Sequence, residues 1–499
     1  MDVIKLLVAG WVSASLGLAW DGLAAAPARA EGDKPAAVQP AAGRPSAVQP
    51  PAVQPPVGKP KAPPAYEVLR FNEDWSALRA TPSCKRCDWG DRLKALEVGP
   101  CAWLDVGGQV RLRYEHFENF GWSDADAADD GWLLTRLRLH ANLELGRNLR
   151  FFAEGIYADQ EKRVLGPRPI DENHLDLQNL FVEVRGDLGG TKAGLRVGRQ
   201  ELLYGKQRLI GPLDWGNTRR TFEGAVAYLK GDGWRLDGFF AQPVVVAIDD
   251  FDESAEVDFA GLYYANTCRK GTVWELYGFY YNNEAKAFFG VTGEDERFTI
   301  GGAARGPIYG TTLDYDAEAA WQGGTFAGGD IATWMATAEL GWKPCDVCWK
   351  PRLAVGADYA SGDDDGPGGD QGTFHQLFPT GHLWFGWADV IGRQNLVAGR
   401  VTLSAQPWNK VTVRGDLHAF WRAETADAVY NAAGTVQRAP GGSDELFVGT
   451  ELDLLVTWKA QRHLDLEVGY GHFFAGDFLS DSGSSEDIDF VWLGATLTF

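Results

Sequence analysis

Arginines spaced two residues apart are the side chains of this sequence best suited to chemistry. Arg111 and Arg113 have one residue between them, and so do Arg136 and Arg138. Because successive side chains of a β-strand point to opposite faces, each pair would present two guanidinium groups on one face. A guanidinium is permanently charged, and its rigid fork fits a carboxylate or a phosphate. These pairs therefore predict a surface that can bind anions.

Other arginines extend the same predicted pathway. Strand-like segments carry Arg196, Arg400 and Arg414, and Arg199, Arg208, Arg219, Arg220 and Arg393 lie in or beside long connections. Acidic residues share the polar faces, so opposite charges that pair and brace a water-filled wall are the alternative for most of these arginines. For Arg199 both interpretations stay open: it faces a permeant at a constriction, or it pairs with Glu201 or Glu223 and fixes a loop.

Catalytic motifs are missing from the sequence. It contains no Gly-x-Ser-x-Gly elbow, no His-Glu-x-x-His and no phosphate-binding loop. The run from Asp363 to Gly366 resembles a calcium loop in charge alone, because it lacks the ligand spacing of an EF-hand. We therefore expect no enzymatic activity, no catalytic residue, no metal and no cofactor.

The cysteines suggest a structural role. They are Cys84, Cys87, Cys101, Cys268, Cys345 and Cys348. An even number in an exported chain favours disulfides, and the alternative is one tetrahedral zinc site built from the two Cys-x-x-Cys pairs. We expect disulfides that pin residues 65–101 to one end of the remaining structure.

A long alternation between residues 133 and 145 identifies the elements that position the arginines. Leu133, Leu137 and Leu139 share one face with further apolar residues, whereas Arg136 and Arg138 lie on the opposite face. Apolar residues facing lipid and polar residues facing a lumen are typical of a transmembrane barrel strand. A strand of a soluble sandwich is usually about half as long.

The same alternation marks eighteen segments, an even number that suits an antiparallel transmembrane barrel. They are expected near 102–116, 132–146, 148–159, 176–186, 192–202, 219–230, 233–243, 256–266, 272–282, 296–304, 311–323, 331–342, 350–361, 392–406, 409–423, 445–459, 461–474 and 488–499. The connections alternate between long loops, such as 203–218 and 362–391, and tight turns, such as 146–147 and 231–232. Long extracellular loops and short periplasmic turns are typical of outer-membrane barrels, and all six cysteines would lie on the periplasmic side.

Four regions follow from composition and pattern. Residues 1–30 have the charge, apolar run and small-residue site of a secretory signal peptide. Residues 31–64 are rich in Pro and Ala and predict a disordered linker; the alternative is a recognition segment for a periplasmic secretion partner. Residues 65–101 form the cysteine-containing periplasmic segment, and residues 102–499 form the barrel. The terminal Phe499 resembles the insertion signal of bacterial outer-membrane barrels.

The formal charge excludes one class of partner. At −21 over 499 residues, the chain lacks the basic footprint that nucleic acid requires. An exported chain without a run of about 20 apolar residues after its signal must span a membrane as a closed barrel. The expected location is the outer membrane, with outer-membrane lipid as a partner.

Several blocks resemble the alginate-export outer-membrane porins. They include residues 195–200 (Leu-Arg-Val-Gly-Arg-Gln), 221–224 (Thr-Phe-Glu-Gly), 374–382 (Phe-His-Gln-Leu-Phe-Pro-Thr-Gly-His) and 392–396 (Gly-Arg-Gln-Asn-Leu). The resemblance implies an eighteen-stranded barrel that passes an anionic polysaccharide through an arginine-lined constriction. It places Arg199, and by a looser match Arg393, on that pathway. The segment 461–474 departs from the family, because it carries Asp465 and Glu467 where the family has basic residues.

These observations together predict an outer-membrane channel that passes an anionic, alginate-like exopolysaccharide out of the periplasm. The alternative is a general or substrate-selective diffusion porin for small anionic solutes.

Overall fold

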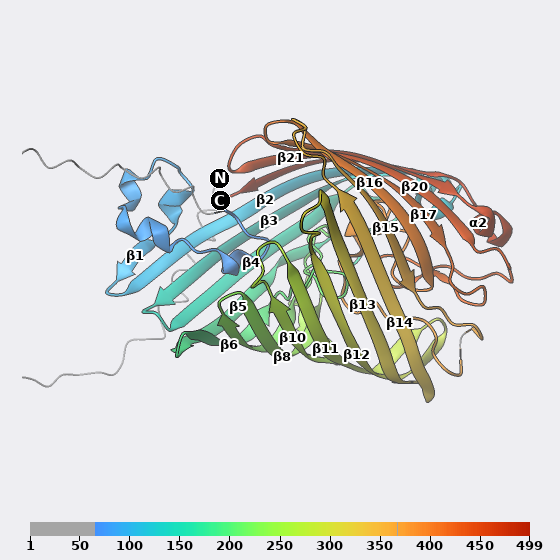
Figure 1. Ribbon diagram of the computed structural model, residues 1–499, viewed down its shortest axis with the longest axis horizontal. Coiled ribbons are helices and arrows are strands. Elements are labelled where there is room, and N and C mark those ends of the chain that lie inside the picture. Colours follow the sequence, from blue (N-terminus) through green and yellow to red (C-terminus); the bar gives the residue numbers. More distant parts are fainter. Residues whose placement is uncertain (1–64, 367) are drawn as a thin grey trace, which may run out of the picture. The chain divides into compact units, whose positions relative to one another are not determined.

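The computed structural model describes residues 65–366 and 368–499. The predicted signal peptide (1–30) and linker (31–64) lie outside the described residues. From residue 102 onward the chain forms a wall of antiparallel strands, each paired with its neighbours along the chain (Figure 1). The first wall strand pairs with the last, with Val110 opposite Leu497, so the sheet closes into a barrel. The predicted fold is therefore confirmed.

The wall contains eighteen strands, as predicted from the alternation. They are β2 (Ala102–Glu118), β3 (Asp130–Leu145), β4 (Leu149–Glu161), β5 (Asn173–Leu188), β6 (Thr191–Gln200), β7 (Phe222–Gly231), β8 (Trp234–Val245), β10 (Val257–Asn266), β11 (Val273–Phe288), β12 (Val291–Pro307), β13 (Leu313–Phe326), β14 (Gly329–Trp342), β15 (Arg352–Ala360), β16 (Leu396–Trp408), β17 (Val411–Trp421), β20 (Phe447–Lys459), β21 (Leu464–Ala475) and β22 (Ile488–Thr498).

The remaining elements of the described chain are short strands, one short helix and 3₁₀ turns. The strands are β1 (Leu96–Gly99), β9 (Glu253–Ser254), β18 (Val429–Tyr430) and β19 (Val436–Arg438), and the single described α-helix is α2 (Asp477–Ser482). The 3₁₀ turns are η1 (Arg70–Asn72), η2 (Ser76–Ala80), η3 (Ser83–Lys85), η4 (Asp91–Leu93), η5 (Phe120–Trp122), η6 (Asp126–Ala128) and η7 (Gly381–Leu383). Among the described residues, no helix is both long and apolar enough to cross a bilayer.

Side-chain alternation in β3 has the predicted orientation. Arg136 and Arg138 are each 1% exposed and face the lumen, whereas Leu139 is 39% exposed on the outer face. The outer face is apolar around the barrel: Leu262 and Ile300 are 62% and 63% exposed there. The period of two thus separates an apolar outer surface from a polar interior.

The connections define two ends of the barrel. At the turn end, successive strands are joined by short links such as 146–148, 189–190, 232–233 and 409–410. At the loop end, long connections span 201–221, 361–395 and 422–446. Two loop-end connections are nevertheless tight, because β11 and β12 run beyond the predicted segments and pair as far as Phe288 and Val291, and β13 and β14 similarly meet at Phe326 and Gly329.

Residues 65–101 lie against the turn end. The guanidinium of Arg70 donates hydrogen bonds to the carbonyls of Gly108 and Phe499 (3.0 and 2.8 Å), on either side of the closing seam. Phe71 enters the lumen and packs edge-on against Phe152 and Phe181. The segment is therefore held by the barrel through hydrogen bonds and a small aromatic cluster.

The cysteines lie on separate turn-end segments. Cys101 precedes β2, Cys268 lies between β10 and β11, and Cys345 lies between β14 and β15. All six cysteines are exposed and unpaired in the structure. The disulfides stay a prediction for the exported protein, and alkylation of the unreduced protein, followed by mass spectrometry, counts its free thiols.

Candidate functional site in the barrel lumen

Two long connections fold into the barrel and meet inside it. We name them lumen loop 1 (residues 201–221, between β6 and β7) and lumen loop 2 (residues 361–395, between β15 and β16). Ile210 and Phe378 form a parallel β-bridge between the loops. The Gly211 N–H donates to the Phe378 carbonyl (2.9 Å), and the Phe378 N–H donates to the Leu209 carbonyl (2.8 Å). The loops therefore form one hydrogen-bonded unit that narrows the lumen.

Aromatic side chains of the wall support this unit. Phe239, Phe259 and Phe279 face inward from β8, β10 and β11 and belong to one buried cluster with loop residues such as Ile210. Phe378 of lumen loop 2 packs edge-on against Phe259, with ring centroids 4.9 Å apart. The sequence pattern predicts a lumen lined by charges and does not reveal this apolar sector, because inward and outward aromatics alternate there with little polar contrast.

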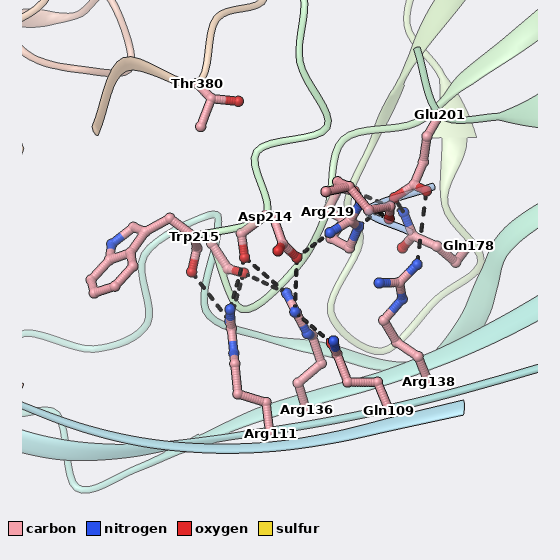
Figure 2. Close-up of polar contacts among 12 residues, drawn as sticks. Gln109, Arg111, Arg136, Arg138, Gln178, Glu201, Asp214, Trp215, Arg219 and Thr380 are labelled. Carbon is pink, nitrogen blue, oxygen red and sulfur yellow. Dashed lines mark hydrogen bonds and ion pairs between the residues drawn. The ribbon is translucent and has the colours of Figure 1, made fainter. Parts of the chain in front are cut away.

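The wall arginines bind the backbone of lumen loop 1. Figure 2 shows Arg111 and Arg136 extending from the wall toward Asp214 and Trp215. Arg111 donates to the carbonyls of Asp214 (2.7 Å) and Gly216 (2.8 Å). Arg136 donates to the Gly216 carbonyl (3.0 Å) and forms an ion pair with Asp214 (2.9 Å). Two arginines that were predicted to face a permeant thus hold lumen loop 1 inside the barrel.

Arg113 joins the same cluster through an aromatic ring. It donates to the Trp215 carbonyl (2.7 Å), and its guanidinium carbon lies 3.6 Å from the centroid of the Trp215 ring. His382 of lumen loop 2 stacks on Trp215 at a centroid separation of 4.0 Å. Cation–π attraction and stacking therefore connect the wall, lumen loop 1 and lumen loop 2 at one point.

Most other predicted pathway arginines are paired with carboxylates. Arg138 lies 3.0 Å from Glu154, Arg196 3.2 Å from Glu183, Arg393 2.7 Å from Asp358, Arg400 2.5 Å from Glu339, Arg414 2.6 Å from Asp416, and Arg208 2.8 Å from Asp316; Arg219 pairs with Glu201 and Asp214. Buried charges are stable when they are paired in this way. The bracing alternative therefore describes these seven residues.

Arg199 also has partners within the protein. Its guanidinium lies 2.7 Å from Glu223 on the neighbouring strand β7. It also donates to the carbonyls of Leu177 (3.1 Å) and Asp252 (2.6 Å). Of the two partners predicted for a brace, Glu223 forms the ion pair. The geometry supports a loop-fixing role for Arg199 over direct contact with a permeant.

Arg111 and Arg220 are different, because neither has a carboxylate within ion-pair distance among the described residues. Arg220 donates to the carbonyls of Gly211 (3.1 Å) and Pro379 (2.9 Å) and so bridges the two lumen loops. Burial lowers the pKa of Arg220 to about 10, so it remains charged at neutral pH. The hydrogen-bond acceptors of Arg111 are backbone carbonyls of lumen loop 1 and the side-chain oxygen of Asn217. The lumen loops thus contact two arginines that have no ion-pair partner among the described residues.

The matching family model, alginate export, covers residues 102–492. The chain belongs to the alginate export family. The match includes β2, both lumen loops and all of the lumen arginines described in this section. No curated protein matches the sequence.

Solved structures similar to this alginate export family member are outer-membrane porins of Pseudomonas aeruginosa. OccD3 (OpdP) superposes with a TM-score of 0.56 at 12% identity, covering 81% of this chain and 93% of that one. OpdK, solved with vanillate, gives a TM-score of 0.54 at 10% identity and covers 79% of this chain and 98% of that one. OccK11 (OpdR) gives 0.52 at 13% identity, with coverages of 79% and 96%. At these identities the likeness concerns the fold alone.

Proposed function

We propose that this protein is an outer-membrane channel through which an anionic polysaccharide of the alginate class leaves the periplasm. Membership of the alginate export family and the closed eighteen-stranded barrel support this function. The observation that carries it is that Arg111 and Arg220 lie on the lumen loops without an ion-pair partner among the described residues, whereas Arg113 and Arg136 beside them pair with Glu115 and Asp214. A positive constriction selects anions, because it favours their entry over that of cations.

The proposed orientation places the turn end, with residues 65–101, in the periplasm and the long loops outside the cell. Short periplasmic turns and long extracellular loops are usual in outer-membrane barrels. Residues 1–30 would direct export and be removed, and residues 31–64 would link the barrel to a periplasmic partner or act as a spacer. The protein needs no catalytic residue, metal or cofactor for passive transport.

A selective diffusion porin for small anions is the second candidate. The observation that favours it is that most lumen arginines already form ion pairs with carboxylates of the protein. Examples are Arg136, Arg208 and Arg219. Two hydrogen-bonded loops also lie inside the barrel, and a narrower lumen favours small solutes over a polymer. Small carboxylates would then pass where a polyuronate could not.

Efflux from liposomes separates the two candidates. Vesicles that contain the purified protein are loaded with a fluorescently labelled oligouronate, a labelled neutral oligosaccharide of equal length, or benzoate as a small anion. Release of the oligouronate ahead of the neutral sugar supports the exporter. Release of benzoate alone supports the porin, and retention of all three solutes contradicts both.

A further inference from the structure

Part of the N-terminal segment lies inside the turn end of the lumen. We name residues 68–73 the plug segment. Its Phe71 is 3% exposed and belongs to a buried apolar cluster against which Leu203 of lumen loop 1 packs. Arg219 of lumen loop 1 donates a hydrogen bond to the Val68 carbonyl (3.3 Å). The plug segment therefore fills lumen space on the turn-end side of lumen loop 1 and contacts that loop directly.

The lumen next to the plug segment contains more guanidinium groups than carboxylates. Ion pairs join Arg150 to Glu183 (2.6 Å), Arg196 to Glu183 (3.2 Å), Arg185 to Glu183 (3.7 Å) and Glu144 (2.9 Å), and Arg79 to Glu144. Within the described chain, four arginines thus share two carboxylates. A buried charge needs a partner, so the surplus guanidinium groups require other acceptors or an anion.

Phe71 contacts two of these surplus guanidinium groups. Arg150 donates to the Phe71 carbonyl (2.5 Å), and the guanidinium carbon of Arg196 lies 4.4 Å from the centroid of the Phe71 ring. Arg150 and Arg196 are 5% and 6% exposed, and the Nε atom of each lacks a hydrogen-bond partner among the described residues. A carboxylate would bind the two groups more strongly than a neutral carbonyl and ring, because its hydrogen bonds to guanidinium are charge-assisted.

A cavity of about 290 Å³ lies beside this contact. It is lined by Leu69, Phe71, Asn72, Arg196, Leu203 and Tyr204, among others. The plug segment, the wall and lumen loop 1 all contribute to this lining, and Arg196 borders the cavity. Departure of Phe71 would enlarge the cavity and uncover Arg150.

A buried charge opposes docking of the plug segment. Lys94, in the same N-terminal segment, is 0% exposed, and its ammonium group has no hydrogen-bond partner among the described residues. Burial of an unpaired ammonium group is unfavourable. Undocking returns Lys94 to water and offsets part of the apolar contact that is lost. This balance suits a segment that leaves its site.

We propose that the plug segment covers a binding site for a carboxylate, formed by Arg150 and Arg196, and that the permeant displaces the segment. A uronate carboxylate takes the place of the Phe71 carbonyl and ring and accepts hydrogen bonds from both guanidinium groups. This inference rests on the proposed function, to which it adds an entry site for the permeant and the segment that closes it.

Hydrogen exchange of the purified protein in detergent tests the displacement. Exchange of residues 66–76 is measured alone, with an oligouronate, and with a neutral oligosaccharide of equal length. At ten times its dissociation constant, a ligand that binds only the undocked state lowers the docking equilibrium about elevenfold. The oligouronate should therefore accelerate exchange roughly tenfold, and the neutral sugar should not. R150Q/R196Q should lose the acceleration. The control R269Q/R352Q, which removes two other turn-end arginines, should retain it.

Unchanged or slower exchange of the wild type with the oligouronate overturns the inference. Acceleration that R150Q/R196Q retains, or that the control also loses, overturns the assignment of the site to Arg150 and Arg196.

Conductance in planar bilayers tests the plug segment by a second route. Phe71→Ala should increase the current and should lower the concentration of oligouronate that interrupts it from the turn-end side. Lys94→Met should raise that concentration, because docking is no longer opposed by a buried charge. Phe251→Ala removes a 76% exposed phenylalanine at the loop end and is the matched control, with unchanged currents expected. Heat-modifiable electrophoretic mobility identifies variants with an intact barrel.

The wild type distinguishes failure of this inference from failure of the proposed function. An anion-selective wild type whose sensitivity to oligouronates is shared by Phe71→Ala and Lys94→Met refutes the plug segment alone. A wild type that does not conduct, or whose current oligouronates never interrupt, also contradicts the proposed function.

Discussion

The guanidinium of Arg113 stacks on the ring of Trp215 at 3.6 Å, and this contact joins the barrel wall to lumen loop 1. His382 of lumen loop 2 stacks on the same ring, with the ring centroids 4.0 Å apart. Trp215 is thus enclosed between a wall residue and the second loop. We expect the position of both loops, and hence the width of the lumen, to depend on this ring.

Replacing Trp215 should loosen the constriction without unfolding the barrel. Trp215→Ala removes both stacking contacts at a cost of up to about 3 kcal/mol to loop packing, the lower end of the range for buried aromatics, because Trp215 is partly buried. We expect larger and noisier single-channel currents with unchanged heat-modifiable electrophoretic mobility. Trp274→Ala, on the outer face of β11, is the matched control and should leave the currents unaltered. Wild-type currents in Trp215→Ala would show that the ring does not set the width.

Arg111 should contribute to anion selectivity, because it has no ion-pair partner among the described residues. A unit charge about 4 Å from an ion in water is worth about 1 kcal/mol, so Arg111→Ala should lower the anion-to-cation permeability ratio about fivefold. Arg111→Lys retains the charge and should retain most of the selectivity. Reversal potentials in a salt gradient measure the ratio. Equal ratios for Arg111→Ala and wild type would indicate a purely structural arginine.

Arg199 should act as a brace. Arg199→Glu would place a carboxylate beside Glu223 and lose two hydrogen bonds to carbonyls, and we expect a loss of about 1–2 kcal/mol of stability with little change in selectivity. The charge-swapped double variant R199E/E223R should recover part of this loss. Thermal unfolding in detergent and reversal potentials provide the two readouts. A large fall in anion selectivity with undiminished stability would restore the interpretation that Arg199 faces the permeant.

Lys94 makes the docking of residues 65–101 depend on pH. It is fully buried without a hydrogen-bond partner among the described residues, and burial lowers its pKa from 10.5 to about 8. Between pH 8 and 10.5, Lys94 is protonated in the unfolded segment but largely deprotonated in the docked segment. Docking should therefore strengthen as the pH rises through this window, and it should not change with pH below the window.

Lys94→Met should abolish this dependence and strengthen docking at pH 7 by up to about 3 kcal/mol, given 1.36 kcal/mol per pKa unit. Hydrogen exchange of residues 65–101 between pH 7 and 10, corrected for the intrinsic exchange rate, measures the effect. The prediction would be contradicted if protection in the wild type decreased as the pH rises. It would also be contradicted if Lys94→Met were less protected than the wild type at pH 7.

The strands were predictable because each carries its own signal. In β3, alternation of leucines with Arg136 and Arg138 identifies both the strand and its inward face from local sequence alone. The ends of β11 and β12 were not predictable, because residues 283–295 lack this contrast and their pairing is decided by backbone hydrogen bonds.

The lumen was predictable in composition but not in contacts. The arginines do face inward, yet the partners of Arg111 and Arg220 are backbone carbonyls, which every residue has and no sequence pattern marks. The stacking of His382 on Trp215 joins loops that are more than 150 residues apart in sequence. Such contacts depend on the paths that the two loops take in the folded protein, and no local sequence pattern specifies those paths.

Conductance in planar bilayers tests the central claim most directly. The wild-type protein is inserted into a bilayer with asymmetric potassium chloride, and oligouronates of increasing length are added on the periplasmic side. The account predicts an anion-selective channel whose current is interrupted by oligouronates and not by neutral oligosaccharides of equal length. A large, weakly selective conductance that oligouronates do not change would contradict it.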